Sequence, residues 1–576
     1  MLASGGTGAQ WIKPTADPSS PFHATRCHFI HPPTGNCLGI WIPCPGIDLK
    51  TCPALPLLIC LLIPLVGLTG GCSVQRASIH RAHQAFYDGD FSRAKSQLQA
   101  IGDRSRPDRH STALDLAMVE LTSGNAAAAE KRLRELRDHF DQHSLPAPID
   151  NTLSLTTDDL ARAYRINDYE TVLLRSMLAI CSLANDGVDA PAYCLQATRA
   201  QDTLWPVDED IQAEINQASA SMNLTDQEDV PESGDLVDDQ EPRPDQELAE
   251  QQQVEQEAAE RALQAWRSGP KVALPAYLRG TMREATHMDY SDAAQAFRLV
   301  NYIQPSFIAA NHDIARAEQG VHSKRGHGVL CVIALVGPGP RLVETQAPTT
   351  TASLQIASMI LQSSQGDVQI PNLASVRVPT VEIPHSDVMC IGVSALSPAT
   401  RSTSPVQLVN HANQEQAVTH QLATHEQILG VTETLTDVGA LAFAKSEAEM
   451  PWTVARAVAR RVTKEAAVHT TTKMMGLDGT QANLAHAMLS TAWSASERTD
   501  TRCWGLLPRE FQALRSELPV GQNVVELAPV DQAGNVIGDP VQQTVTIRDG
   551  ETQFLIVTAP QQILSVVSTS DDRSGP

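Results

Sequence analysis

The sequence lacks an excess of positive charge. Its 576 residues include 43 Lys and Arg against 66 Asp and Glu, which gives a formal net charge of −23 at pH 7. Nucleic-acid binding needs a basic surface that can contact phosphates, and adhesion to anionic lipid needs the same sign of charge. The composition therefore argues against a nucleic-acid partner and against attachment to a membrane by charge alone.

A disulfide framework is also absent from the sequence. Of its 11 cysteines, five precede Cys72 and five follow it. Those that follow are odd in number and mostly far apart, namely Cys181, Cys194, Cys331, Cys390 and Cys503. A small disulfide scaffold has an even and closely spaced set. We interpret these cysteines as small buried hydrophobic side chains.

No catalytic motif is found in the sequence. It contains neither His-Glu-x-x-His nor Gly-x-Ser-x-Gly. Residues 326–328 (Gly-His-Gly) lack the other glycines of a phosphate loop, and residues 337–340 (Gly-Pro-Gly-Pro) lack amide donors, so we expect turns there. Residues 385–387 (His-Ser-Asp) are adjacent, whereas a catalytic triad joins separated positions. We therefore expect no enzyme activity, no cofactor and no metal.

The apolar run near the N-terminus is too short for a membrane-spanning helix, which needs roughly 20 residues. It has 16 residues, from Pro53 to Leu68, with Lys50 before it and small residues leading to Cys72 after it. A charge, an apolar core and small residues in this order are typical of a secretory signal. Because it ends on cysteine, the segment resembles the lipobox of bacterial lipoproteins. We predict a signal peptide over 49–71 and lipidation at Cys72; the alternatives are an ordinary cleaved signal and a retained anchor.

This resemblance also implies a location. Ser73 follows Cys72, whereas many diderm bacteria use Asp at this position to retain lipoproteins in the inner membrane. We therefore expect an outer-membrane lipoprotein that faces the periplasm and is held by acyl chains on Cys72. Since a signal begins at the N-terminus, we interpret residues 1–48 as a non-native or disordered extension. We prefer this to a zinc site built from the cysteines and histidines of that segment.

Self-similar helical patterns follow the predicted signal. Gly89 and Gly124 lie 35 residues apart, and each is followed by Ala after five residues and by Leu after nine. A third copy has Gly187 in its turn and Ala192 five residues later. A fourth copy places residues typical of tetratricopeptide repeats in order: Tyr277, Gly280, Tyr290, Ala293, Phe297 and Pro305.

These patterns resemble tetratricopeptide repeats, in which helical hairpins stack into a solenoid. We predict such helices over 72–221 and 263–320; generic antiparallel helices are the alternative. Between them, residues 226–260 carry 14 acidic side chains and one Arg. Because this composition cannot bury enough apolar surface to fold, we predict a disordered acidic linker over 222–262. A role as an acidic recognition segment is the alternative.

Strand patterns dominate after residue 320. Apolar or alternating runs predict strands at 329–336, 376–383, 387–395, 523–527, 541–548 and 551–557, and helical spacing predicts helices at 452–474 and 483–493. Asp549-Gly550 predicts a β-hairpin between the last two strands. The predicted fold is therefore α+β and multidomain: a tetratricopeptide-like α-solenoid, an α+β domain over 321–520, a β-rich segment with a hairpin over 521–560, and a disordered tail over 561–576.

Residues 497–521 carry a distinctive signature, ERTDTRCWGLLPREFQALRSELPVG. It resembles the E-x-x-D-x-R-x-W-x-x-LP motif, followed by LP-x-G, of an uncharacterised family of bacterial tetratricopeptide-type envelope lipoproteins. Residues 167–180, 337–341 and 456–465 resemble further parts of this family in the same order. The matching signature positions are Asp500, Arg502, Trp504, Leu507 and Pro508. Cys503 and Gly505 depart from the pattern, in which Ser and Arg are expected.

This resemblance implies a role in envelope assembly, because members lie beside lipoproteins similar to activators of penicillin-binding proteins or to curli-secretion lipoproteins. Our hypothesis is a scaffold that binds other envelope proteins or lipoproteins. The alternatives are an envelope enzyme acting on peptidoglycan or glycans and a purely structural spacer. For the signature we expect a structural role rather than a ligand site. In that role Asp500 pairs with Arg502, Trp504 and Leu507 pack the helices onto the strands, and Pro508 ends the segment.

Overall fold

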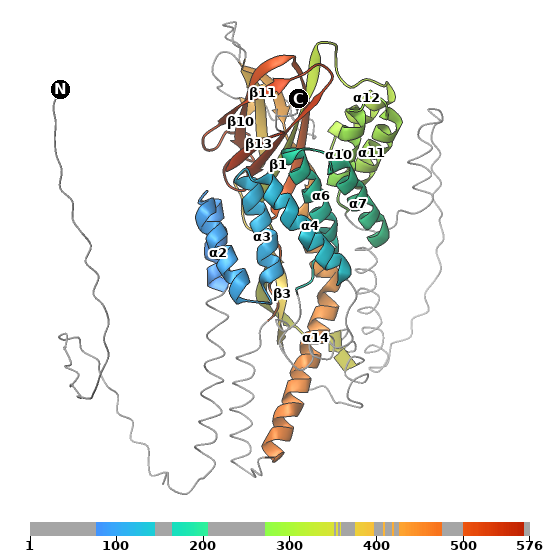
Figure 1. Ribbon diagram of the computed structural model, residues 1–576. Coiled ribbons are helices and arrows are strands. Elements are labelled where there is room, and N and C mark those ends of the chain that lie inside the picture. Colours follow the sequence, from blue (N-terminus) through green and yellow to red (C-terminus); the bar gives the residue numbers. More distant parts are fainter. Residues whose placement is uncertain are drawn as a thin grey trace, which may run out of the picture. The chain divides into compact units, whose positions relative to one another are not determined.

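The computed structural model describes residues 76–143, 164–205, 271–350, 353–354, 357–358, 375–396, 407–408, 418–419, 426–474 and 499–569. The predicted signal, Cys72, the acidic linker and the helix expected at 483–493 lie outside these residues. Within them, helices come first along the chain and strands dominate later (Figure 1). The described part is thus a mixture of helix and sheet. None of its helices is both long and apolar enough to cross a membrane.

The helices pack against one another in chain order. Residues 76–87 are helical, and the helices after them are α2 (Phe91–Arg104), α3 (Arg109–Thr122), α4 (Ala126–Gln142), α6 (Asp168–Asn185), α7 (Ala190–Leu204), α10 (Leu274–Glu284), α11 (Tyr290–Ile303) and α12 (Ala309–Glu318). From α2 to α12, each of these helices contacts the next (Figure 1). Their buried side chains form one continuous core.

Glycine turns and polar caps start several of these helices. Gly89, Gly124 and Gly187 have φ of +79°, +82° and +73°, a conformation that glycine adopts without strain. Asp90 and Asn125 then cap α2 and α4 by accepting a hydrogen bond from the first turn of the helix. The turns predicted at these glycines are confirmed.

The caps set a common register for the buried side chains. The fourth and eighth residues after the cap of α2 are Ala94 and Leu98, and both are fully buried. The same positions hold Ala129 and Leu133 in α4, and Ala293 and Phe297 in α11, again fully buried. A small side chain at the first position lets the neighbouring helix approach closely.

In α7 the register differs from the predicted one. Its cap is Asp189, two residues after Gly187 rather than one. The fourth and eighth positions are therefore Tyr193 and Ala197, which are buried, whereas Ala192 is exposed. The expectation from the repeat pattern that Ala192 occupies the same position as Ala94 and Ala129 is thus wrong. In α2 and α4 the small side chain comes first and the large one second, whereas in α7 the order is reversed. The two side chains together therefore still fill a similar volume between the helices.

A five-stranded sheet packs against the helices. Its order is β13 (Ser565–Ser568), β12 (Thr552–Ala559), β1 (His327–Pro338), β9 (Pro508–Pro519), β8 (Glu433–Asp437), and β1 runs parallel to β12. In β1, odd-numbered residues from Cys331 to Leu335 join the helix core, and even-numbered residues from Leu330 to Val336 join a second core. The buried strand predicted at 329–336 is confirmed, and burial on both faces explains its continuous apolar run.

The second core lies between this sheet and a four-stranded sheet. That sheet has the order β11 (Val541–Ile547), β10 (Gly521–Val530), β4 (Cys390–Leu396), β7 (Glu426–Val431). The predicted hairpin at Asp549-Gly550 is wrong. The turn is present, with Gly550 at φ +73°, but β11 pairs with β10 while β12 pairs with β1 and β13. β12 is largely buried and suits the middle layer, whereas β11 is half-exposed and suits the outer sheet.

Smaller elements complete the described residues. β2 (Arg341–Pro348) and β3 (Ser375–Glu382) form an antiparallel pair, and the short β5 (Gln407–Leu408) pairs with β6 (Val418–Thr419). α14 (Val438–Met474) contacts β3 through a small separate core. The helix predicted at 452–474 is confirmed and begins earlier. β13 occupies part of the tail that we predicted to be disordered, because its residues pair with β12.

Gly280 of α10 allows a direct test of the helix packing. A Cβ atom there would lie 2.6 Å from Cε1 of Phe297 in α11. We expect Gly280→Ala to lower the free energy of unfolding in urea by about 1–3 kcal/mol through overpacking, although Ala favours the helix more than Gly does. Adding Phe297→Leu should recover part of this loss. Strictly additive effects of the two substitutions would contradict the close contact.

Candidate functional site

The signature residues lie between the helices and the central sheet. Trp504 and Leu507 are 1% and 2% exposed and belong to the core that the helices share with that sheet. Pro508 is the first residue of β9 and is paired with Pro338 of β1. Residues 499–507 therefore connect the two layers without regular secondary structure of their own.

Arg502 is the polar centre of this segment. Its Nε and Nη2 donate to the two carboxylate oxygens of Asp500 at 2.8 and 2.6 Å, and its Nη1 donates to the carbonyl oxygen of Pro107 at 2.8 Å. The ring centroid of Tyr164 lies 5.9 Å from the guanidinium carbon. Because the Arg502 side chain is only 4% exposed, its charge depends on these partners. The hydrogen bond to Pro107 thus attaches the segment to the loop between α2 and α3, while the ion pair with Asp500 lies within the segment.

Asp115 of α3 makes the second attachment. Its Oδ1 accepts a hydrogen bond from the backbone N–H of Leu506 at 2.9 Å, and its Oδ2 lies 2.7 Å from Nε2 of His83. The Asp115 side chain is 3% exposed. A carboxylate so well buried is tolerated only when its oxygens are bound in this way.

Gly505 makes room for His83. A Cβ atom at this position would overlap the imidazole ring. Any larger residue would therefore displace His83 from Asp115. The glycine at position 505 accordingly has a local steric reason, which the sequence alone did not reveal.

A cavity of about 480 Å³ opens beside this segment. Helix 76–87, the loop 105–108 and residues 501–505 form part of its lining. Pro338, the last residue of β1, also lines it. So does Gln561, which lies just beyond the end of β12, the strand parallel to β1. A space of this size is typical of small-molecule sites.

Positive side chains outnumber negative ones in the lining. It contains three arginines, two histidines and two aspartates: Arg76, Arg341, Arg502, His80, His83, Asp108 and Asp115. The chain as a whole has the opposite balance, with a net charge of −23. Each of the three arginines is paired with a carboxylate: Arg76 with Glu344, Arg341 with Glu382 and Arg502 with Asp500.

Two side chains of the lining, the Cys503 thiol and the Tyr87 hydroxyl, are poorly suited to act as nucleophiles. Burial raises the pKa of the Cys503 thiol to about 12, so it is protonated at neutral pH. Burial also raises the pKa of the Tyr87 hydroxyl well above its ordinary value. Neither group therefore supplies an activated nucleophile under ordinary conditions.

The adjacent residues His385, Ser386 and Asp387 do not form a triad in the structure. His385 Nε2 lies 3.1 Å from Asp387 Oδ1, and both side chains are exposed. The Ser386 hydroxyl is buried and donates instead to the carbonyl oxygen of Pro560 at 3.1 Å. Ser386 therefore binds backbone and has no contact with the histidine that would activate it.

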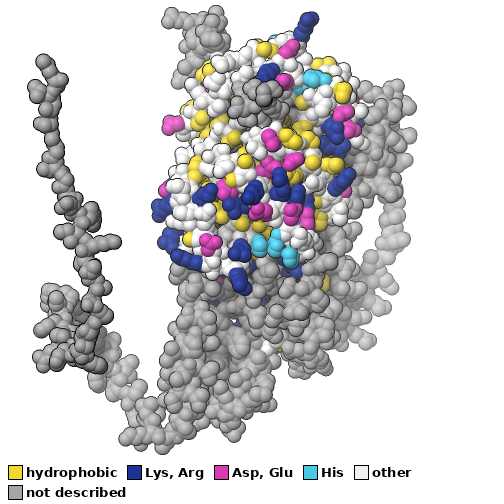
Figure 2. All heavy atoms as spheres, in the orientation of Figure 1, with side chains coloured by type: hydrophobic (Ala, Val, Ile, Leu, Met, Phe, Trp, Pro, Cys, Tyr) yellow, Lys and Arg dark blue, Asp and Glu magenta, His cyan; other side chains and the backbone are white. Residues whose placement is uncertain are grey.

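Three histidines that sequence analysis did not single out lie stacked in the structure. The ring of His110 in α3 lies 4.0 Å from that of His139 in α4, and His139 lies 4.4 Å from His143. Figure 2 shows histidine side chains grouped on this face. Burial lowers the pKa of His110 to about 4, so it is neutral at pH 7. The four-residue spacing of His139 and His143 was the available signal.

Stacked rings face one another and do not converge on an ion. Across the ranges that the structure covers, no cluster of His, Cys, Asp or Glu has a metal-binding arrangement. The histidine stack is therefore better understood as packing between α3 and α4 than as a metal site.

Comparison with known proteins finds no relative. No family model, no curated protein and no solved structure matches this chain. The resemblance of residues 497–521 to an envelope lipoprotein family accordingly stays a prediction from the sequence.

Asp115→Ala tests the attachment of the signature segment. The substitution leaves the Leu506 N–H and the His83 ring without their partner, so we expect the free energy of unfolding to fall by about 2–4 kcal/mol. The matched control is Asp103→Ala on the exposed surface of α2, which should change stability by less than about 0.5 kcal/mol. Similar effects of both substitutions in urea denaturation would contradict the role of Asp115.

Proposed function

We propose that this chain is a lipoprotein of the bacterial cell envelope, anchored through acyl groups on Cys72 to the outer membrane and facing the periplasm. There its helices act as a scaffold that binds other envelope proteins or lipoproteins. The observation that carries this proposal is the run of helices from α2 to α12, each packed against the next. Such an array buries its apolar side chains between neighbours and leaves a long surface for partners.

The buried register supports a tetratricopeptide-like solenoid. A small side chain follows the cap by four residues in α2, α4 and α11, as helical hairpins of this kind require. In the fourth repeat the ring centroid of Tyr277 lies 6.0 Å from that of Phe297 and 5.4 Å from that of Phe307. Gly280 permits this packing because it has no side chain. A generic array of antiparallel helices is the alternative.

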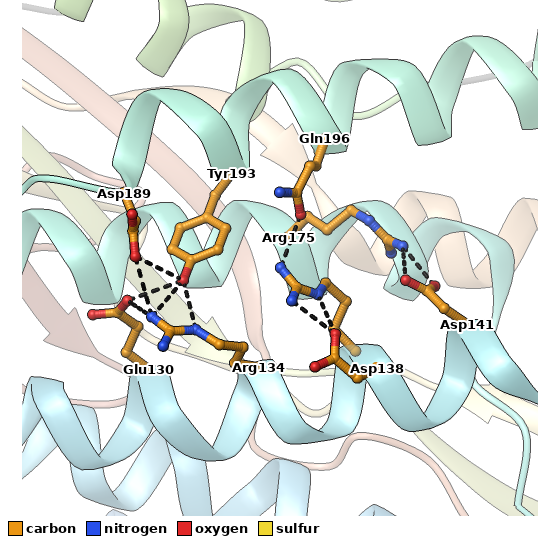
Figure 3. Close-up of polar contacts among 9 residues, drawn as sticks. Glu130, Arg134, Asp138, Asp141, Arg175, Asp189, Tyr193 and Gln196 are labelled. Atoms are coloured by element: carbon orange, nitrogen blue, oxygen red, sulfur yellow. Dashed lines mark hydrogen bonds and ion pairs between the residues drawn. The ribbon is translucent and has the colours of Figure 1, made fainter.

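Polar contacts hold neighbouring helices at fixed positions. Figure 3 shows Arg134 of α4 donating to the hydroxyl of Tyr193 in α7 at 2.9 and 2.7 Å, and this hydroxyl donating to Glu130 at 3.0 Å. Farther along α4, Asp141 accepts hydrogen bonds at 2.6 and 2.9 Å from Arg175 of α6. A surface fixed in this way loses little conformational entropy when a partner binds, which suits a scaffold.

A second network joins the later helices to the central sheet. The Glu284 carboxylate of α10, 1% exposed, accepts hydrogen bonds from Arg316 of α12 at 2.5 and 2.9 Å. Arg515 of β9 lies 3.6 Å from the same carboxylate. Arg316 also pairs with Asp313 at 2.7 Å. Because these charges are buried, each depends on the others, and the helices and sheet are held as one unit.

An envelope enzyme and a structural spacer are the competing classes. Hydrolysis of glycans usually needs two carboxyl groups flanking the substrate. Asp108 and Asp115 both line the cavity, but Asp115 is bound by two partners and Asp108 accepts a hydrogen bond from the Ser105 hydroxyl at 2.6 Å. Neither is presented to a substrate as a free acid–base pair would be, so we prefer the scaffold.

Crosslinking mass spectrometry in intact cells tests the scaffold. With an amine-reactive reagent we expect envelope proteins to be linked to the exposed Lys131 of α4 more often than to the exposed Lys324, which precedes β1 and lies outside the helical array. The absence of any envelope partner, or equal yields at the two lysines, would count against it. Acyl labelling of wild type and Cys72→Ser tests the anchor separately: label should be lost only in the variant.

A further inference from the structure

The four-stranded sheet ends in β11, a strand that pairs along one side only. It pairs with β10 over its whole length, from Val541 opposite Leu527 to Ile547 opposite Gly521, without any shift of register. No other strand that the structure describes pairs with it. The outer side of such a strand carries a row of backbone N–H and C=O groups that can accept a further strand.

The composition of β11 favours such pairing. Its seven residues, Val-Gln-Gln-Thr-Val-Thr-Ile, include no charge, no proline and no glycine. The nearest charged residues in the chain, Asp539 and Arg548, lie outside the strand. Val, Thr and Ile are among the residues most favourable in strands. Charge and proline are two of the means by which proteins keep outer strands from pairing, and β11 uses neither.

Two of the other outer strands are protected by their length or shape. β13 has only four residues. In β7, Leu429 is an extra residue opposite the step from Val393 to Ser394, and Gly430 has φ +144°. A bulge of this kind twists an outer strand and interrupts its pairing. Neither strand therefore offers a long, regular edge.

The fourth outer strand, β8, is covered by helical residues. Its Thr434 carbonyl oxygen accepts a hydrogen bond from Nε2 of Gln304 at 3.5 Å. Its Thr436 hydroxyl accepts hydrogen bonds from the backbone N–H groups of Ala273 and Leu274 at 3.2 and 3.1 Å. Of the four outer strands of the two sheets, β11 alone lacks protection of these kinds within the described ranges.

We propose that β11 pairs with β11 of a second copy of this chain, in antiparallel orientation about a two-fold axis at Thr544. This register places Val541 of one copy opposite Ile547 of the other and Thr544 opposite itself. In a two-fold interface a residue on the axis meets its own kind, so any charge there would repel its copy. The uncharged β11 avoids this repulsion although the chain as a whole has a net charge of −23.

The same register keeps the two faces of the sheet intact. Val545 and Ile547 point into the core between the sheets, whereas Gln542 and Thr544 are exposed. Paired residues are both odd-numbered or both even-numbered, so inward-facing residues meet inward-facing ones. The two four-stranded sheets therefore become one continuous sheet of eight strands.

The expected dimer is weak. A pair of seven-residue strands buries less area than a stable interface, so we expect a Kd on the order of 10 µM. The proposed anchor at Cys72 would favour the pair further, because chains held on one membrane have a high local concentration. Pairing itself needs neither the anchor nor a partner on the helices, so it can fail independently of the proposed function.

Sedimentation equilibrium of the full chain carrying Cys72→Ser tests the pairing. At about 100 µM we expect mostly dimer. Adding Thr544→Lys at this exposed position places two like charges opposite one another and should raise the Kd at least about tenfold. Thr345→Lys is the matched control, because Thr345 is exposed on β2 in a different sheet, and it should leave the Kd unchanged.

A mixture of Thr544→Lys and Thr544→Glu chains provides a rescue. Each variant alone meets its own charge on the axis and should be monomeric, whereas the mixture brings opposite charges together and should recover the dimer. Recovery excludes misfolding as the cause of the loss. Association through the apolar run at 53–68 would be common to all variants and would not respond to these substitutions.

Three results would overturn the proposal. The first is a dimer that survives Thr544→Lys, and the second is a mixture that stays monomeric. The third is a monomeric chain without either substitution at Thr544, which would leave the edge of β11 to a strand of another protein.

Discussion

Two charged groups with almost no contact to solvent, Asp115 and Arg502, bind an irregular segment to the first helices. Arg502 reaches the carbonyl oxygen of Pro107, and Asp115 holds the amide of Leu506. Between these attachments Trp504 enters the core shared by helices and sheet. Because a buried charge without partners is strongly destabilising, the segment and the helices constrain one another.

The central sheet depends on this constraint. The segment leads directly into β9, whose register against β1 runs from Pro508 opposite Pro338 to Pro519 opposite His327. β1 in turn divides the apolar interior into a helix side and a sheet side. The cavity forms at the same junction, and Arg502 of the segment is part of its lining.

Local chemistry determines how much of this arrangement could be predicted. The glycine turns, the buried strand at 329–336 and the helix at 452–474 follow from conformational freedom and hydrophobic pattern, and the structure confirms them. The turn at Asp549-Gly550 was also predictable, but the partners of its two strands were not. A strand pairs within the layer that suits its burial, and the partner strands of that layer come from distant parts of the chain.

The candidate site was harder to predict for the same reason. The signature residues were visible in the sequence, whereas their partners Pro107 and Asp115 lie about four hundred positions away along the chain. The exchange of large and small residues in α7 followed from a cap shifted by one residue.

The central claim is that residues 500–508 are a fixed part of the core and not a surface loop. Hydrogen exchange at the Leu506 amide tests it most directly, with the Ile333 amide in β1 as the internal reference. The account predicts that the two amides exchange at similar rates, through global unfolding only, because both are buried and hydrogen-bonded. Exchange at Leu506 faster by several orders of magnitude would show that the segment opens locally and would contradict the account.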